Sequence, residues 1–486
     1  MFSLVQDSHV AMFGEAHAIP FERVIVEKLS HPLNFKEYFM ESTLECIEPN
    51  AAGIDIGSFS HFVAVPQERD SEVVREFGGF TEDLHLMSEW LKKCGIKTVA
   101  MEATGVYWIP VYEVLLEQGF DVCLVNARYY KNVSGRKSDV LDCQWLQQLH
   151  SYGLLKPSFQ PGEEEGKLRQ LVRHRANLVR WGATHAQQMQ KALAQMNLQL
   201  TNVVSDILGD TGMKIIRAIC HGERDPKKLA ILRDTRCKNS VETIEKSLHG
   251  YYRAEIVFSL KQALSSYDHY QQQIAECNGE IEKLTDYFDD KSDGQKVIKK
   301  REAKRNNIGF DAQERLTRIL GVNLTEIPGI NALTALTVIA EIGLSVDKWK
   351  NSKAFASWLG LCPGTKISGG KRLGGKTKAC KNRASEALRI AASALYRSQT
   401  SLGSFLRRMK ARLGPAKAIT AAAHKLAVII YTMIKEKKSY DELGAGYYDQ
   451  LHKERAVKNL EKFARRLGFE ITPKKIEQAS MTACST

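Results

Sequence analysis

The first third of the chain alternates short apolar runs with turn residues, a pattern typical of an α/β domain. Helical periodicity appears in three segments, and Pro110 and Gly119 mark the two ends of the second one. The predicted order is three strands, helix, strand, helix, strand, helix, which layers helices on a sheet. The expected strands lie at 53–65 (broken in two by a Gly-Ser turn), 72–80, 97–104 and 121–127, and the expected helices at 81–94, 108–119 and 137–153.

Two long amphipathic helices follow. The first is expected at 165–200. The second carries a heptad seam, in which apolar residues are spaced alternately by four and three. Such helices pair within one chain or across a dimer, and a seam of this length favours the dimer. The seam consists of Ile256, Leu260, Ala263, Tyr267, Tyr270, Ile274, Cys277, Ile281, Leu284 and Phe288.

The remaining segments predict a charged linker and a compact helical domain. Residues 289–312 are polar and charged, as in a linker. Residues 324–343 predict a helix, a Pro-Gly turn and a helix, and residues 362–380 predict a loop rich in Gly and Lys. Further helices are expected at 351–359, 382–398 and 415–437, with a basic amphipathic helix at 449–468.

The order of the first elements matches the RNase H/RuvC-like fold. The expected fold class is therefore α/β plus all-α, with a long coiled-coil arm between the two parts. We expect an N-terminal extension at 1–50, a RuvC-like domain at 51–160, a helical arm at 161–290, a basic linker at 291–315, a helical C-terminal domain at 316–445 and a helical tail at 446–486.

Composition narrows the class of protein. The 486 residues carry a formal charge of +13, which suggests a polyanionic partner such as nucleic acid. The charge is clustered: seven basic and no acidic residues lie from Lys366 to Arg383, and six basic and one acidic from Lys296 to Arg305. None of the ten cysteines forms a C-x-x-C pair, so neither a zinc site nor a disulfide framework is indicated. We expect a soluble, cytoplasmic protein without a membrane partner.

Four acidic residues stand where this fold would bring them together. Asp55 lies within an apolar strand, where a carboxylate is costly unless it is paired or bound to a metal. Glu102 ends another strand, and Asp139 and Asp142 share one helix face. Taken singly, the helix pair would be ordinary solvated acids and Glu102 a strand-end cap. Together the four predict a site for Mg²⁺ or Mn²⁺, which prefer oxygen ligands and support phosphodiester chemistry.

A serine in the second half is a candidate nucleophile. Ser368 precedes Gly369 and Gly370, whose lack of side chains lets a phosphate approach, and basic residues surround it. On local grounds a phosphate-contacting or flexible loop is the simpler interpretation. Ser352 and Ser357 are weaker candidates because they fall within helix-like stretches. The basic residues expected to contact nucleic acid are Lys366, Lys371, Arg372, Lys376, Lys378, Lys381 and Arg383.

From about Gly53 to the C-terminus, the chain resembles the insertion-sequence transposases of family one-ten, with its eleven-eleven branch. These are DEDD-type serine recombinases guided by a bridge RNA. The segments that carry the resemblance are GIDIGS, MEATGVYWIPVYEVLLEQGFDVCLVNA, GRKSDVLDCQWLQQLHSYGLL, residues 203–230, IPGINALTALTVIAEIG, FASWLGLCPGTKISGGK and the helix Arg383–Arg397.

The resemblance implies roles. The metal-binding tetrad would be Asp55, Glu102, Asp139 and Asp142, and Ser368 would attack one DNA strand to form a phosphoserine link. Many members carry two serines before the glycine, whereas Ile367 leaves only Ser368 here. Implied partners are donor and target DNA, a bridge-type guide RNA, and a homodimer that assembles into a tetramer with a composite active site.

Two other functions remain open from the sequence. A RuvC-like junction-resolving endonuclease would use the tetrad and a metal-activated water, but it would need neither the long arm nor the serine domain. A catalytically idle nucleic-acid scaffold would not need the tetrad. Replacing Ser368 separates the recombinase from the resolvase, and replacing Asp55 tests the scaffold.

Overall fold

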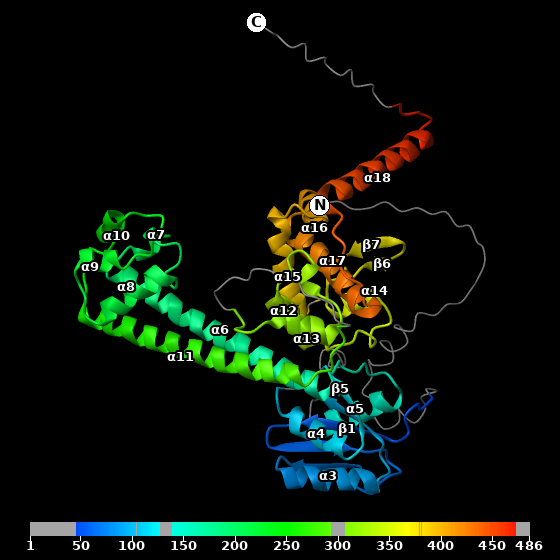
Figure 1. Cartoon of the computed structure of the whole chain (residues 1–486). Helices are drawn as coiled ribbons and strands as arrows, with labels where there is room; N and C mark the ends of the chain where they lie inside the picture. Colours follow the sequence, from blue (N-terminus) through cyan, green and yellow to red (C-terminus); the bar gives the residue numbers. More distant parts are fainter. Residues whose placement is uncertain are drawn as a thin grey trace, which may run out of the picture. The chain divides into compact units, whose positions relative to one another are not determined.

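The computed structural model describes residues 45–103, 105–126, 139–292, 307–378, 380 and 382–472 (Figure 1). The chain divides into two compact units, Met1–Phe159 and Gln160–Thr486, called here the first and second units. Residues 1–44, residues 293–306 of the expected linker, and Lys381 lie outside the described residues.

A five-stranded sheet forms the centre of the first unit, in the order β3-β2-β1-β4-β5. The first three strands are antiparallel neighbours, whereas β4 and β5 run parallel to β1. This topology confirms the RNase H-like α/β fold class. The strands are β1 (Ala51–Ile56), β2 (Ser60–Ala64), β3 (Val74–Gly78), β4 (Thr98–Glu102) and β5 (Asp121–Val125).

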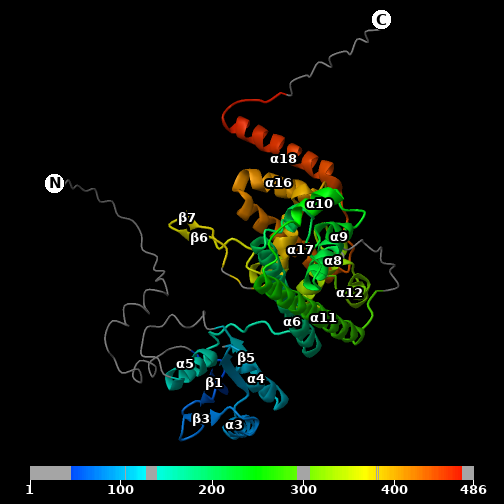
Figure 2. The ribbon, with the colours of Figure 1, turned by 90° about the vertical axis from the view of Figure 1, so that its left-hand side faces the viewer.

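Helices cover both faces of this sheet (Figures 1 and 2). Ile54 and Met101 face one side, where they pack with Leu91 and Leu115 of two helices. The alternating residues of β1 and β4 face the other side, where the third helix packs on β1. The helices are α3 (Thr81–Lys93) and α4 (Trp108–Glu117) on the first face and α5 (Asp139–Ser151) on the second.

The helix α5 lies unusually close to β1 because Gly53 has no side chain. A Cβ built on Gly53 would lie 2.3 Å from both the Cys143 carbonyl oxygen and the Gln147 amide nitrogen. Ala51, on the same face of the strand, accepts a hydrogen bond from the Gln147 side-chain nitrogen at 3.3 Å. These contacts fix how far along β1 the helix begins.

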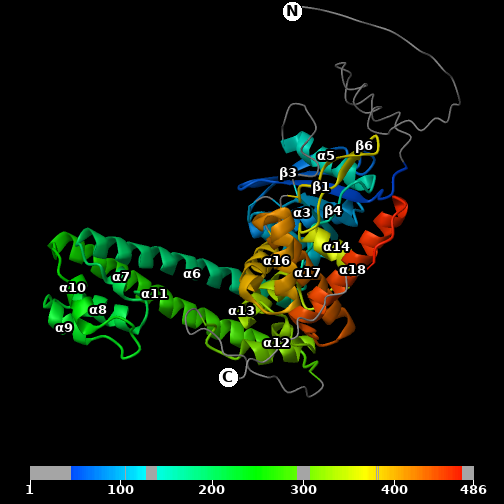
Figure 3. The same cartoon turned by 90° about the horizontal axis from the view of Figure 1, so that it is seen from above.

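The second unit contains an antiparallel arm of two helices, α6 (Glu163–Gln195) and α11 (Ala254–Asp286), which run side by side (Figures 1 and 3). The arm's far end carries a small apolar core. The predicted seam packs against α6 of the same chain, which is one of the two pairings that the sequence leaves open. The helices of this distal core are α7 (Leu200–Val203), α8 (Asp210–Cys220), α9 (Pro226–Ile231) and α10 (Val241–Ser247).

The other described residues of the second unit form helices and a small hairpin. The segment expected to be helical before the Pro-Gly turn is only a 3-10 turn, η3 (Leu324–Glu326), and α16 was not predicted from the sequence. The helices are α12 (Ala312–Leu320), α13 (Ala332–Ile342), α14 (Ser352–Trp358), α15 (Arg383–Ala394), the 3-10 turn η4 (Leu395–Arg397), α16 (Ser401–Leu413), α17 (Pro415–Glu436) and α18 (Gly444–Arg466).

The predicted loop at 362–380 is partly ordered as a hairpin of β6 (Lys366–Ser368) and β7 (Lys371–Gly374). Gly369 and Gly370 form its turn with φ of 53° and 73°. Two consecutive positive φ values suit a tight hairpin turn and require glycine-like residues. The strands escaped prediction because they are short and polar.

The helix α17 is apolar enough to cross a bilayer by length and composition, and among the described residues it is the only such helix. It packs against α14, α15 and α16. Ala422, Leu426 and Ile430 along its length are completely buried. These contacts make α17 the core helix of the C-terminal helices.

An ionic network joins the arm to α13. The Arg173 guanidinium donates to both carboxylate oxygens of Glu341, at 2.8 and 2.7 Å. Arg169 donates to the Ala340 and Glu341 carbonyl oxygens at 3.2 and 2.8 Å, and burial lowers its pKa. Glu341 is only 4% exposed, so both of its partners are needed to offset its desolvation.

We expect Gly53→Ala to destabilise the first unit by about 1–3 kcal/mol, because the added methyl group must displace the α5 backbone. Thermal unfolding of the full chain measures this loss. The matched control is Gly279→Ala in α11, where a Cβ meets no atom within 4 Å. It should stabilise slightly. An equally stable Gly53→Ala variant would show that α5 does not pack as described.

We expect Glu341→Gln to lower the stability of the second unit by about 3 kcal/mol, the lower part of the range for a broken buried pair, since Arg173 is half exposed. Glu280→Gln is the control: this acid pairs with Lys283 at 2.7 Å on the surface. Its loss should cost less than about 1 kcal/mol. Equal effects in chemical denaturation would contradict the anchoring role of Glu341.

Candidate functional site

Asp55 and Glu102 emerge side by side from adjacent parallel strands. The register pairs Gly53 with Ala100 and Ile54 with Met101, so the next step pairs Asp55 with Glu102. Residues paired in this way point to the same face, about 4.8 Å apart along the hydrogen-bonding direction. Asp55 is half-buried and Glu102 is 5% exposed. Two carboxylates so close and so buried repel each other unless cations compensate them.

The helix α5 brings Asp139 and Asp142 to the edge of the sheet at which β1 and β4 end. Its Gln147 lies beside Ala51 and its Cys143 beside Gly53, so the helix runs antiparallel to β1. Two strand residues span about 6.8 Å and four helical residues about 6 Å. Asp55, two residues beyond Gly53, therefore lies opposite the first turn of α5. Asp139 and Asp142 both belong to that turn, where acids are also favoured by the helix dipole.

The pKa of the Cys143 thiol is sensitive to the acids around it. Burial raises its pKa, and the negative charges of Asp55 and Asp142 raise it further, to about 12. Asp55 comes from the sheet and Asp142 from α5, so the sheet and the helix both place negative charge near this thiol. Within the described residues, however, no three His, Cys, Asp or Glu side chains converge closely enough to form a metal site as they stand.

Exposed aromatic side chains lie at the same end of the sheet. Phe59 is 89% exposed in the turn after β1, and Phe80 is 83% exposed just after β3. The two segments touch, since a Cβ on Gly79 would lie 3.1 Å from the Phe59 carbonyl oxygen. They are the most exposed large apolar side chains described, and the sequence offered no signal beyond apolar residues in turns. The carboxylate edge is thus flanked by apolar surface.

Ser368 belongs to the second unit. It ends β6, is exposed, and lies opposite Lys371 in the hairpin register. The exposed Lys366, Lys376 and Lys378 lie along the same segment. Arg372 is part of β7, Arg383 opens α15, and Lys381 lies outside the described residues. Ser352 and Ser357 are in α14, as expected.

We predict that Cys143 is among the last cysteines to be alkylated in the folded protein. A pKa raised to about 12 keeps the thiol protonated, and the neutral form reacts slowly. Residue-resolved mass spectrometry after alkylation at about pH 9 would show this, with the exposed Cys46 reacting early.

Asp55→Asn should lower the Cys143 pKa and speed its labelling, because one of the nearby negative charges is gone. Glu76→Gln, on the surface strand β3, is the control and should leave the labelling rate unchanged. Fast labelling of Cys143 in the unchanged protein would contradict the packing of α5.

Two family models match the chain. A transposase model of the DEDD IS110 type matches residues 52–198, and a model described as Transposase IS116/IS110/IS902 family matches residues 322–407. No curated protein matches it. The first match spans all four acids and the second spans Ser368. The chain therefore carries both IS110-family transposase domains, in order, and these domains identify an enzyme that cuts and rejoins DNA.

Proposed function

We propose that this transposase cuts and rejoins DNA through a covalent link to Ser368, with divalent ions held by Asp55, Glu102, Asp139 and Asp142. One observation carries the proposal. The β1–β4 register and the close approach of α5 at Gly53 direct all four acids toward one edge of the sheet. Such a concentration of carboxylates in a DNA-acting enzyme is best explained by metal ligation.

The donor set suits Mg²⁺ or Mn²⁺. A DEDD-type domain implies divalent metal use, and four carboxylates offer only hard oxygen ligands. Ions bound there would supply charge stabilisation at the reacting phosphate. Because the four side chains do not already converge, we infer that they draw together when ions bind. Asp139, in the first turn of α5, is exposed and has the freedom to turn, whereas Asp142 and Asp55 are half-buried.

Ser368 supplies the nucleophile in this proposal. Its Oγ loses a proton and bonds to phosphorus, while one bridging oxygen of the phosphodiester leaves as a strand-end hydroxyl. Rejoining reverses the step: a hydroxyl of another strand attacks the phosphoserine, and Oγ leaves and regains its proton. The number of phosphoester bonds is unchanged, so no external energy source is needed. The exposed position of Ser368 and its lysine neighbours support access by a phosphate.

We also propose that a bridge-type guide RNA selects donor and target DNA, and that a homodimer assembles into a tetramer. The support is the likeness to the family and the basic segment 366–383. Since the α11 seam is used against α6 of the same chain, a dimer would use other surfaces.

The test is a strand-cleavage assay with magnesium, labelled DNA and the candidate RNA of the element. We expect a protein–DNA adduct that survives denaturation and that disappears in Ser368→Ala. Ser357→Ala, an exposed serine in α14, is the matched control and should keep the adduct. Asp55→Asn should reduce cleavage by about a hundredfold or more, as loss of a metal-site group does.

Two outcomes would contradict the proposal. Equal cleavage by Ser368→Ala without an adduct would leave a metal-dependent nuclease that uses water. Undiminished cleavage by Asp55→Asn would remove the tetrad from the reaction.

A further inference from the structure

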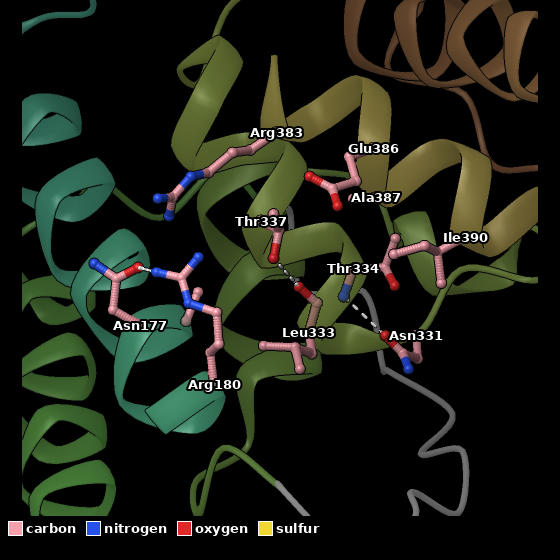
Figure 4. Close-up of a pocket in the computed structure, with 11 residues that line it drawn as sticks. Asn177, Arg180, Asn331, Leu333, Thr334, Thr337, Arg383, Glu386, Ala387 and Ile390 are labelled. Atoms are coloured by element: carbon pink, nitrogen blue, oxygen red, sulfur yellow. Dashed lines mark hydrogen bonds between the residues drawn. The ribbon is translucent and has the colours of Figure 1, made fainter. Parts of the chain in front are cut away.

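A pocket opens in the second unit where the arm leaves α13 (Figure 4). Its volume is about 460 Å³, and α6, α13 and α15 form its walls. It begins one helical turn beyond the ionic network of Arg173 and Glu341. Asn177 and Arg180 continue the same stripe of α6, at positions four and seven residues after Arg173. The face of α6 that binds Glu341 through Arg173 therefore continues into this pocket, which it lines with Arg180.

Two guanidinium groups face this cavity. Arg180 and Arg383 reach into the same side of it, and Glu386 lies across from them (Figure 4). Arg180 donates to the Asn177 side-chain oxygen at 2.5 Å, and Arg383 donates to the Arg173 carbonyl oxygen at 3.3 Å. Both acceptors are neutral. These bonds orient the guanidiniums but leave further N–H donors on each.

The rest of the lining is suited to a sugar–phosphate unit. Thr334 and Thr337 of α13 contribute hydroxyl groups, and Leu333 and Ile390 contribute an apolar wall. The volume is much larger than one phosphate group and is in the range of small-ligand sites. An anion placed between the two arginines would relieve their mutual repulsion and accept charge-assisted hydrogen bonds.

We propose that this pocket binds a phosphodiester group, with its attached sugar, of a nucleic acid strand. The inference rests on the proposed function, because it names where the second unit holds a strand during the reaction. The shared chemistry is the sugar–phosphate backbone, which comes either from DNA or from RNA. Because α6 and α15 both line the pocket, a bound strand would contact the arm and the C-terminal helices together.

The test is a binding titration of the full chain with labelled single-stranded DNA, duplex DNA and RNA over a range of salt concentrations. We expect Arg180→Gln and Arg383→Gln each to weaken binding about tenfold and to reduce the salt slope by about one, as loss of one phosphate contact does. Arg180→Lys should keep the slope, because it keeps the charge. Loss on DNA alone or on RNA alone identifies the source of the strand.

Lys191→Gln is the matched control, since it removes one exposed positive charge from the same helix α6 outside the pocket. Binding by both arginine variants at the wild-type level, or losses no larger than that of Lys191→Gln, would overturn the proposal. Thermal unfolding checks that each variant is folded.

The assay also separates this inference from the proposed function. Binding does not require Ser368, so Ser368→Ala should bind as wild type does. If the arginine variants lose binding although no serine adduct forms, the pocket stands and the serine mechanism fails. If adducts form normally while the arginine variants bind as wild type does, only the pocket fails.

Discussion

The second unit depends on the hydrogen bonds and ion pairs that arginines of α6 make to acceptors on α11 and α13. Taking a guanidinium out of water is costly, so its partners must be in place before the helix can dock. Glu341 serves Arg169 and Arg173, while Arg175, 3% exposed, donates to Asn278 of α11 at 2.6 Å. The same helix is therefore held on one side by α13 and on the other by α11. Its direction determines where the arm points and where the pocket opens.

In the first unit a different constraint has the same effect. The missing side chain of Gly53 lets the α5 backbone approach the sheet, and this approach sets which turn of α5 meets the end of β1. In both units, the packing of backbone elements determines where charged side chains lie. In the first unit this packing brings acidic side chains together, and in the second unit it leaves two arginines facing a cavity.

The sequence predicted the parts of this molecule that have a clear period. Strands of the first unit alternate with amphipathic helices, so their order and the approximate positions of Asp55 and Glu102 could be inferred. The hairpin at 366–374 has too few apolar residues to give a strand signal. The α11 seam has the same pattern whether its partner is α6 or another chain. Arg180 looks like an ordinary charge on a solvated helix face, because only the tertiary packing of α13 and α15 places a cavity beside it.

The hairpin that carries Ser368 has little stability of its own. A two-stranded ribbon is marginally stable in water, and Ile367 and Leu373 on it are 68% and 69% exposed. Fixing such a segment costs conformational entropy, and a bound strand is the natural source of the compensating free energy. The serine would then be held still only while a substrate is present. If Ser368 is the nucleophile, its reactivity would then depend on substrate binding, and it would not react in the intervals between successive DNA molecules.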